Sequence, residues 1–96
     1  MNEHRQLHDA TLKEIFLDWE KGSFTAKFIM GSNKNEIFIT GEGIKSFSYN
    51  RVLPWGRSVS VYKCQIESNV SPAILTITMQ SGDKLIGKGD AFFVSM

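Results

Sequence analysis

Short runs of β-branched and aromatic residues recur along this 96-residue chain, and clusters of Gly, Asn, Ser and Asp separate them. The runs repeat about every ten to twelve residues, which is the spacing of an antiparallel all-β domain. Segment 24–28 alternates cleanly, so its two phenylalanines and Ala26 share one face. Residues 36–40 and 73–79 are mixed on both faces, as expected of more central strands. We therefore predict an antiparallel all-β domain of about six main strands, forming a sandwich or a half-open barrel.

The links between the runs favour hairpins. Glycine lies in two short polar links, at 20–23 and 80–83, and it tolerates the positive φ that tight hairpin turns require. Neighbouring strands are therefore expected to pair in sequence as a meander. Pro72 closes a further turn, because proline prevents the preceding strand from running on. The two glycines within residues 87–89 predict a bend or bulge in the last strand.

Residues 11–20 fit two structures. An amphipathic helix has apolar residues at i, i+3, i+4 and i+7, as this chain does at Leu12, Ile15, Phe16 and Trp19. Thr11 and Glu14 add a capping-box pattern. A strand would instead alternate its faces along 15–20, and a hairpin signal follows directly. We favour the strand, and the helix is the alternative.

Composition limits the chain to one domain. With 42% hydrophobic and 22% charged residues, 96 residues suffice for one globular core and not for two, so residues 1–96 are expected to form a single β domain. The lone Cys64 cannot form an internal disulfide, which favours a reducing compartment. The first residues contain no apolar signal segment, and no stretch approaches the length of a membrane span. We expect a cytoplasmic protein with no membrane partner.

Charge is nearly balanced but unevenly distributed. Eleven basic and ten acidic residues give a net charge of +1, far from the excess of a dedicated nucleic-acid-binding protein. No acidic residue lies between Glu42 and Glu67. The basic residues of this segment are Lys45, Arg51, Arg57 and Lys63, and its aromatic residues include Phe47, Tyr49, Trp55 and Tyr62.

Residues that could carry catalysis are sparse. His8 and Asp9 are adjacent, and a carboxylate can raise the basicity of an imidazole, but successive strand residues point to opposite faces. We expect both to satisfy backbone groups where the first strand begins. The spacing of Cys64 from Tyr62 and Ile66 predicts a small buried thiol rather than a nucleophile, which would need a neighbouring base. We expect no catalytic residue, no metal and no cofactor.

Residues 54–61, Pro-Trp-Gly-Arg-Ser-Val-Ser-Val, combine a rigid turn with large recognition side chains. Trp and Arg are enriched in binding hot spots. Pro54 fixes its own φ and favours an extended Leu53, so a stiff turn would present Trp55. We predict a partner-binding surface formed by Tyr49, Arg51, Trp55 and Arg57. The alternative is that Trp55 plugs one end of the sandwich and Arg57 covers it.

Three short blocks resemble a pattern found in small, uncharacterised, single-domain bacterial proteins. The blocks are Leu7-His8-Asp9-Ala10 leading to Asp18-Trp19, Pro54 to Val61, and Met79-Gln80-Ser81-Gly82-Asp83. The resemblance implies a bacterial, cytoplasmic and β-rich protein and no particular reaction. Small proteins of this style are similar to immunity proteins of polymorphic toxin systems, which bind and occlude a toxin.

The expected function is therefore non-catalytic binding of a protein partner, with an immunity-type toxin inhibitor as its most specific form. An acidic toxin domain would suit the basic segment. The alternative is a β-barrel that binds a small ligand or single-stranded nucleic acid, since such folds combine a basic groove with aromatic residues. Binding of nucleic acid is the less favoured alternative, because four basic residues are few for contacts to a phosphate backbone. Edge strands of an open sheet can also pair between two copies and give a homodimer.

Overall fold

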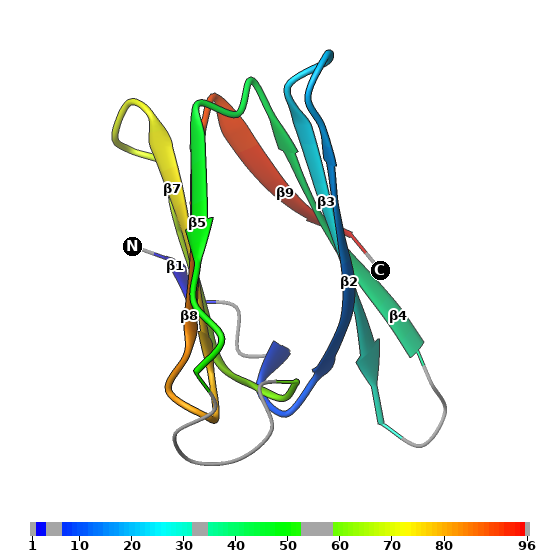
Figure 1. Ribbon diagram of the computed structural model, residues 1–96. Coiled ribbons are helices and arrows are strands. Elements are labelled where there is room, and N and C mark those ends of the chain that lie inside the picture. Colours follow the sequence, from blue (N-terminus) through cyan, green and yellow to red (C-terminus); the bar gives the residue numbers. More distant parts are fainter. Residues whose placement is uncertain (1, 4–6, 32–34, 53–58, 96) are drawn as a thin grey trace.

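Two antiparallel β-sheets face one another as a sandwich in the computed structural model (Figure 1). The structure describes residues 2–3, 7–31, 35–52 and 59–95. Sheet A has the strand order β1-β6-β7-β8-β5, and sheet B has the order β2-β3-β4-β9. The strands are β1 (Asn2–Glu3), β2 (Thr11–Asp18), β3 (Ser23–Met30), β4 (Asn35–Glu42), β5 (Ser46–Tyr49), β6 (Val61–Glu67), β7 (Ala73–Met79), β8 (Lys84–Gly89) and β9 (Ala91–Ser95).

The predicted all-β sandwich and the strand reading of residues 11–18 are confirmed. The strands number nine within the described residues, so six was too few. The four-residue strand β5 was not predicted, and the run expected as one last strand divides into β8 and β9. Sequential pairing holds within β2–β3–β4 and within β6–β7–β8. By contrast, β1, β5 and β9 pair with strands distant in the sequence, so the meander is only partial.

Alternating side chains explain why these segments become strands. In β3 the buried residues are Phe24, Ala26 and Phe28, and in β7 every second residue from Ala73 to Met79 is buried. The two inward faces form one core, and each large apolar side chain placed there stabilises the fold by about 1.5–3 kcal/mol. The described residues contain no helix that is long and apolar enough to cross a membrane.

Glycine closes the two predicted hairpins. Gly22 has φ 67° between β2 and β3, and Gly82 has φ 95° between β7 and β8. The Gly22 N–H donates to the Asp18 carbonyl at 2.8 Å, and the Gly82 N–H donates to Met79 at 2.9 Å. Both turns therefore need the conformational freedom that glycine has at positive φ.

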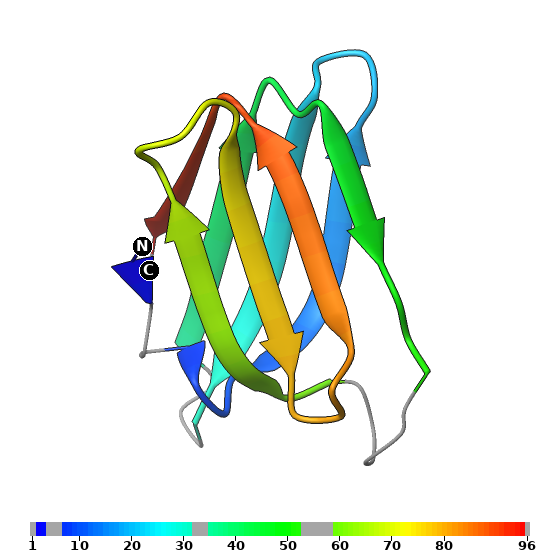
Figure 2. The same cartoon turned by 90° about the vertical axis from the view of Figure 1, so that its left-hand side faces the viewer.

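The predicted bend near residues 87–89 is the point where the chain passes from sheet A to sheet B (Figure 2). The Asp90 N–H, between β8 and β9, donates to the Glu42 carbonyl of β4 at 2.8 Å. Inside this corner the Phe92 ring packs against Gly41. A Cβ atom at Gly41 would lie 2.7 Å from that ring, so β4 can approach Phe92 because residue 41 lacks a side chain.

Replacing Gly41 by alanine is expected to destabilise the protein by about 1–3 kcal/mol, because the added methyl group overpacks the corner against Phe92. Gly87→Ala is the matched control. Its added Cβ would lie 3.4 Å from the same ring, an ordinary contact, and the free energy of unfolding should change by less than about 1 kcal/mol. Urea unfolding of the two variants measures the difference. Equal stability would show that Phe92 does not limit the corner.

Candidate functional site

An open groove runs between the edges of the two sheets, along β2 and β5. Among the described strands, β2 pairs with β3 alone and β5 with β8 alone. A single bridge between Thr11 and Ser60 touches the start of β2. Both strands therefore have one side without a strand partner, and these sides lie next to each other in Figure 1.

Three adjoining hollows make this groove continuous. The central hollow, about 310 Å³, is lined by Ile15 and Leu17 of β2 and by Phe47 and Tyr49 of β5. A hollow of about 230 Å³ shares Leu17 and Phe47 with it, and another of about 250 Å³ shares Ile15 and Tyr49. We call this surface the β2/β5 groove. Each wall of the central hollow consists of two residues that are two positions apart, because every second residue of a strand faces the same way.

The groove walls connect directly to the core. The Phe47 ring lies 5.3 Å from the buried Phe24 ring, and the Tyr49 ring lies 6.2 Å from Phe47, measured between centroids. Tyr49 nevertheless remains 67% exposed, and Leu17 is also exposed. The groove is thus a part of the apolar interior that no element of the described chain covers.

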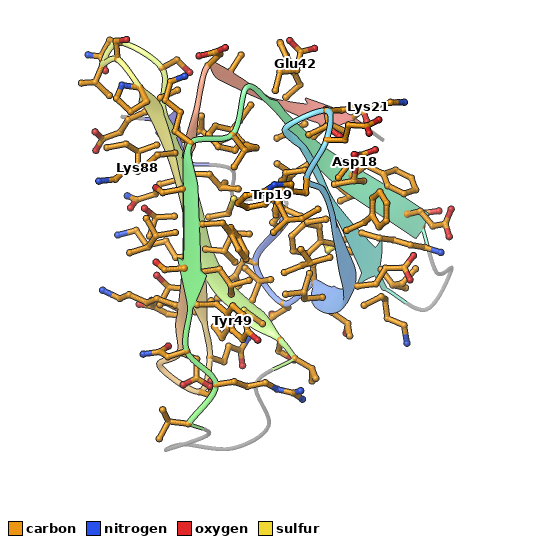
Figure 3. All side chains as sticks on the ribbon, turned by 45° about the horizontal axis from the view of Figure 1, so that its top comes forward. Asp18, Trp19, Lys21, Glu42, Tyr49 and Lys88 are labelled. Atoms are coloured by element: carbon orange, nitrogen blue, oxygen red, sulfur yellow. The ribbon has the colours of Figure 1, made fainter. Side chains whose placement is uncertain are left out.

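Different side chains mark the two ends. Trp19, in the turn after β2, lines one end with Lys45 and is 96% exposed. Arg51, just after β5, lines the other end and is also exposed. Figure 3 shows Trp19 and Tyr49 extending from the two different layers. Trp19 therefore extends the exposed apolar surface of the groove at this end, next to Leu17 and Phe47.

The predicted site residues are only partly located. Tyr49 and Arg51 lie together in the β2/β5 groove, as expected of one surface. Trp55 and Arg57 lie outside the described residues. Lys63 and Tyr62 lie on β6, three strands away from β5 in sheet A, so the basic and aromatic segment does not form a single surface.

The β2 wall of the groove and Trp19 are not among the site residues predicted from the sequence. A signal was present, because Ile15 and Leu17 alternate with Phe16, which makes this strand apolar on both faces. Here β2 turns out to be an edge strand whose inner face is not fully covered. In the sequence this pattern raises only the choice between helix and strand. Whether the apolar residues of β2 are exposed depends on which strands pair beside it, and the pattern does not indicate that.

A buried carboxylate fixes the chain that leaves β5. The Val52 N–H donates to Asp83 Oδ1 at 2.8 Å, and Ser81 Oγ donates to Asp83 Oδ2 at 2.9 Å. Nearby, the Lys84 N–H donates to Asn50 Oδ1 at 2.8 Å. Asp83 belongs to the β7–β8 turn, so this hairpin positions the backbone on both sides of Arg51 at the end of the groove.

The His8–Asp9 pair joins the start of β2 to β6. His8 Nδ1 lies 2.8 Å from the Tyr62 carbonyl oxygen, so this nitrogen must carry the proton and donate. The Asp9 N–H donates to Val61, and the Asp9 carboxylate accepts from the Gln80 side chain. The expected backbone role is confirmed for the His8 ring, whereas the Asp9 carboxylate binds a side chain instead. In the part of the chain that the structure describes, no three His, Cys, Asp or Glu residues cluster as metal ligands would.

Cys64 is buried in the core, as predicted. Desolvation raises the pKa of its thiol to about 12. The prediction that Tyr62 shares the buried face of Cys64 and Ile66 was wrong. A bulge between Val61 and Lys63 interrupts the alternation of β6, so Tyr62 points outward while Cys64 and Ile66 point inward.

Charged residues lie on the outer faces of both sheets. Acidic residues alternate with core residues on sheet B, at Glu14, Asp18, Glu36 and Glu42. Lysines do so on sheet A, at Lys63, Lys84 and Lys88. On sheet B, Lys27 Nζ lies 2.9 Å from Glu36 Oε2, and the hydrogen bond to that carboxylate raises the pKa of Lys27. Glu67 also lies on the outer face of sheet A, so each outer face carries charges of both signs.

No family model matches this sequence, and a search of curated proteins finds no relative. The structure is similar to the crystal structure of an uncharacterized protein from Neisseria gonorrhoeae, with a TM-score of 0.75 and 12% sequence identity. The match covers 99% of this chain and 96% of that chain. At this identity the likeness shows a shared fold over the whole length.

Asp83→Ala is expected to destabilise the protein by about 1–3 kcal/mol, because the Val52 N–H and the Ser81 hydroxyl would lose a buried acceptor. Asp90→Ala is the matched control. Its carboxylate is 66% exposed and lies 3.5 Å from Lys45 Nζ, and a surface ion pair of this kind contributes at most about 1 kcal/mol. Thermal and urea unfolding measure both changes. Similar losses for the two variants would contradict the anchoring role of Asp83.

The Cys64 thiol is expected to be unreactive toward a disulfide reagent such as DTNB in the native protein at pH 8. At that pH a thiol with a pKa of about 12 is almost entirely protonated, and burial blocks access to it. After unfolding in guanidinium chloride, one thiol per chain should react at once. Rapid reaction of the native protein would show that Cys64 is accessible.

Proposed function

We propose that this protein is a non-catalytic binding module that holds a protein partner in the β2/β5 groove. The observation that carries the proposal is the exposed apolar surface between two edge strands, each of which has one side without a strand partner in the described chain. In this surface Trp19 is 96% and Tyr49 is 67% exposed. Contiguous exposed apolar surface of this kind marks interaction sites. Aromatic side chains bury roughly 150–250 Å² each and dominate the energetics of interfaces.

The polar groups around the groove support recognition of a protein. Lys45 and Arg51 stand at its two ends, and β2 contributes Glu14 and Asp18 at the rim. This arrangement of an apolar centre and a charged rim is that of a protein interface. An immunity-type inhibitor of a toxin domain is the specific form that we propose, because occlusion of another protein requires a binding surface and no catalytic group.

The alternative ligands fit this surface less well. Proteins that hold single-stranded nucleic acid combine aromatic and basic side chains on one surface. The basic residues that line this groove are Lys13, Lys45 and Arg51, but Glu14 and Asp18 lie among them and would repel phosphates. The lysines of the outer face of sheet A point away from the groove (Lys88 in Figure 3). Small-molecule pockets enclose most of their ligand, whereas the three adjoining hollows, at about 230–310 Å³ each, form a groove that is open along its length.

The double variant Trp19→Ala/Tyr49→Ala is expected to weaken partner binding at least about 30-fold, since truncating one aromatic hot spot costs about 2 kcal/mol or more. Both side chains are exposed, so the fold should be retained. Tagged wild-type protein captures the partner from a lysate of the source organism, mass spectrometry identifies it, and calorimetry then gives its affinity for each variant.

Tyr62→Ala is the matched control, because Tyr62 is 56% exposed on β6 and lies away from the groove. It should bind the partner as the wild type does. A second variant, Trp55→Ala/Arg57→Glu, tests the predicted contacts outside the described residues. Equal affinity of wild type and groove variant would place the site elsewhere. Captured nucleic acid whose affinity falls steeply with salt would support the alternative function.

A further inference from the structure

The free edge of β5 presents backbone groups at defined positions. The Asn50 N–H donates to the Lys84 carbonyl of β8 at 3.1 Å. In an antiparallel pair, hydrogen-bonded positions alternate along the strand, so Ser48 and Ser46 also bond toward β8 in the register that pairs them with Ile86 and Lys88. The N–H and C=O groups of Phe47 and Tyr49 then point to the side where the described chain provides no neighbouring strand.

The two edges of the groove differ in how well they resist a new strand. A bulge between Leu12 and Glu14 interrupts the pairing of β2, and two charged residues, Lys13 and Glu14, lie at this bulge. The Leu12 N–H is also occupied by the Val59 carbonyl at 2.7 Å. Bulges and charges are the devices that block edge pairing. By contrast, β5 reads Ser-Phe-Ser-Tyr, with an unbroken register and no charge or proline.

The side chains around β5 specify what a pairing strand would look like. Its residues that face the sandwich would enter the central hollow between Leu17 and Tyr49, which favours apolar residues at every second position. Lys45 and Arg51 lie just beyond the two ends of β5, and both are on the groove wall. Acidic residues at the two ends of the segment would complement them.

We propose that the partner supplies an extended segment that pairs with β5 as a sixth strand of sheet A. The segment has alternating apolar residues and acidic residues at both ends. This inference rests on the proposed function, since it assigns the chemistry of the partner at the same groove. Backbone hydrogen bonds to Phe47 and Tyr49 give affinity, and the groove selects the apolar side chains. The groove extends along β2 from Leu12 to Trp19, which is roughly 20–25 Å and accommodates about seven extended residues.

The probe is a displayed library of random nine-residue peptides, selected on the wild-type protein alone, and the affinity of the selected peptide for Tyr49→Ala is measured afterwards. The most enriched peptide is synthesised with every amide free and in two N-methylated forms, one methylated at odd and one at even positions within the central segment. Strand pairing uses alternate amides, so one form should lose at least tenfold in affinity and the other should bind as the parent does. Residue-specific amide exchange is followed by NMR.

On binding of the parent peptide, the amide exchange of Phe47 and Tyr49 is expected to slow at least tenfold, while the Ser48 amide is already protected in the free protein. Equal affinity of the two methylated forms, or unchanged exchange at Phe47 and Tyr49, would overturn strand addition. So would selection of no peptide. Slowing of the same amides with protein concentration alone would identify a second copy as the occupant and also overturn the proposal.

These outcomes separate this inference from the proposed function. If the selected peptide binds the wild type but not Tyr49→Ala, and both methylated forms bind equally, the groove binds its partner without strand pairing. If the peptide binds Tyr49→Ala as tightly as the wild type, the groove assignment itself is wrong. Tyr62→Ala, which retains the groove, should bind the peptide with unchanged affinity. Peptide binding to this variant should slow the amide exchange of Phe47 and Tyr49 as it does in the wild type.

Discussion

The packing of Phe92 at the crossover between the sheets is the interaction on which the rest of this fold depends. The chain can pass from β8 into β9 at Asp90 because Gly41 leaves space for the Phe92 ring on the neighbouring strand. The crossover puts β9 beside β4 at one edge of sheet B. The opposite edge of that sheet is therefore β2, and the corresponding edge of sheet A is β5. The crossover that Phe92 packs thus occupies one edge of sheet B, while β2 and β5 remain edge strands within the described chain.

A chain of aromatic contacts transmits this packing to the groove. Phe92 meets the buried Phe24 ring edge-on at 6.4 Å, Phe24 lies 5.3 Å from Phe47, and Phe47 lies 6.2 Å from Tyr49. The wall of the groove is therefore held by the core and not by a loop. A wall with this support is pre-organised, and binding to it requires little ordering of the protein. The remaining freedom belongs to exposed side chains such as Trp19.

Local sequence patterns predicted the elements that close locally. The strict alternation of β3 and the glycine turns at Gly22 and Gly82 were enough for two of the hairpins. The same patterns could not predict β5, because its four residues pair with Leu85–Lys88, more than thirty positions along the chain. The bulge in β6 likewise turns Tyr62 outward, although its spacing from Cys64 predicts an inward face, and no glycine marks the bulge in the sequence. For the candidate site, Tyr49 and Arg51 were predicted from their place in the basic and aromatic segment near Trp55, whereas Leu17 and Trp19 depend on knowing that β2 is an edge.

The net charge of +1 hides an arrangement that matters for how a partner approaches. Most acidic residues of the first part of the chain lie on the outer face of sheet B beside Lys27, and the lysines of β6 and β8 lie on that of sheet A beside Glu67. The groove opens between these faces, so its ends and rims carry both signs while its floor is apolar. Opposed charges of this kind orient an approaching partner and exclude those of the wrong polarity, although they add little affinity themselves. A segment with acidic ends therefore lies more favourably against β5, which Lys45 and Arg51 flank, than against β2 with its own carboxylates.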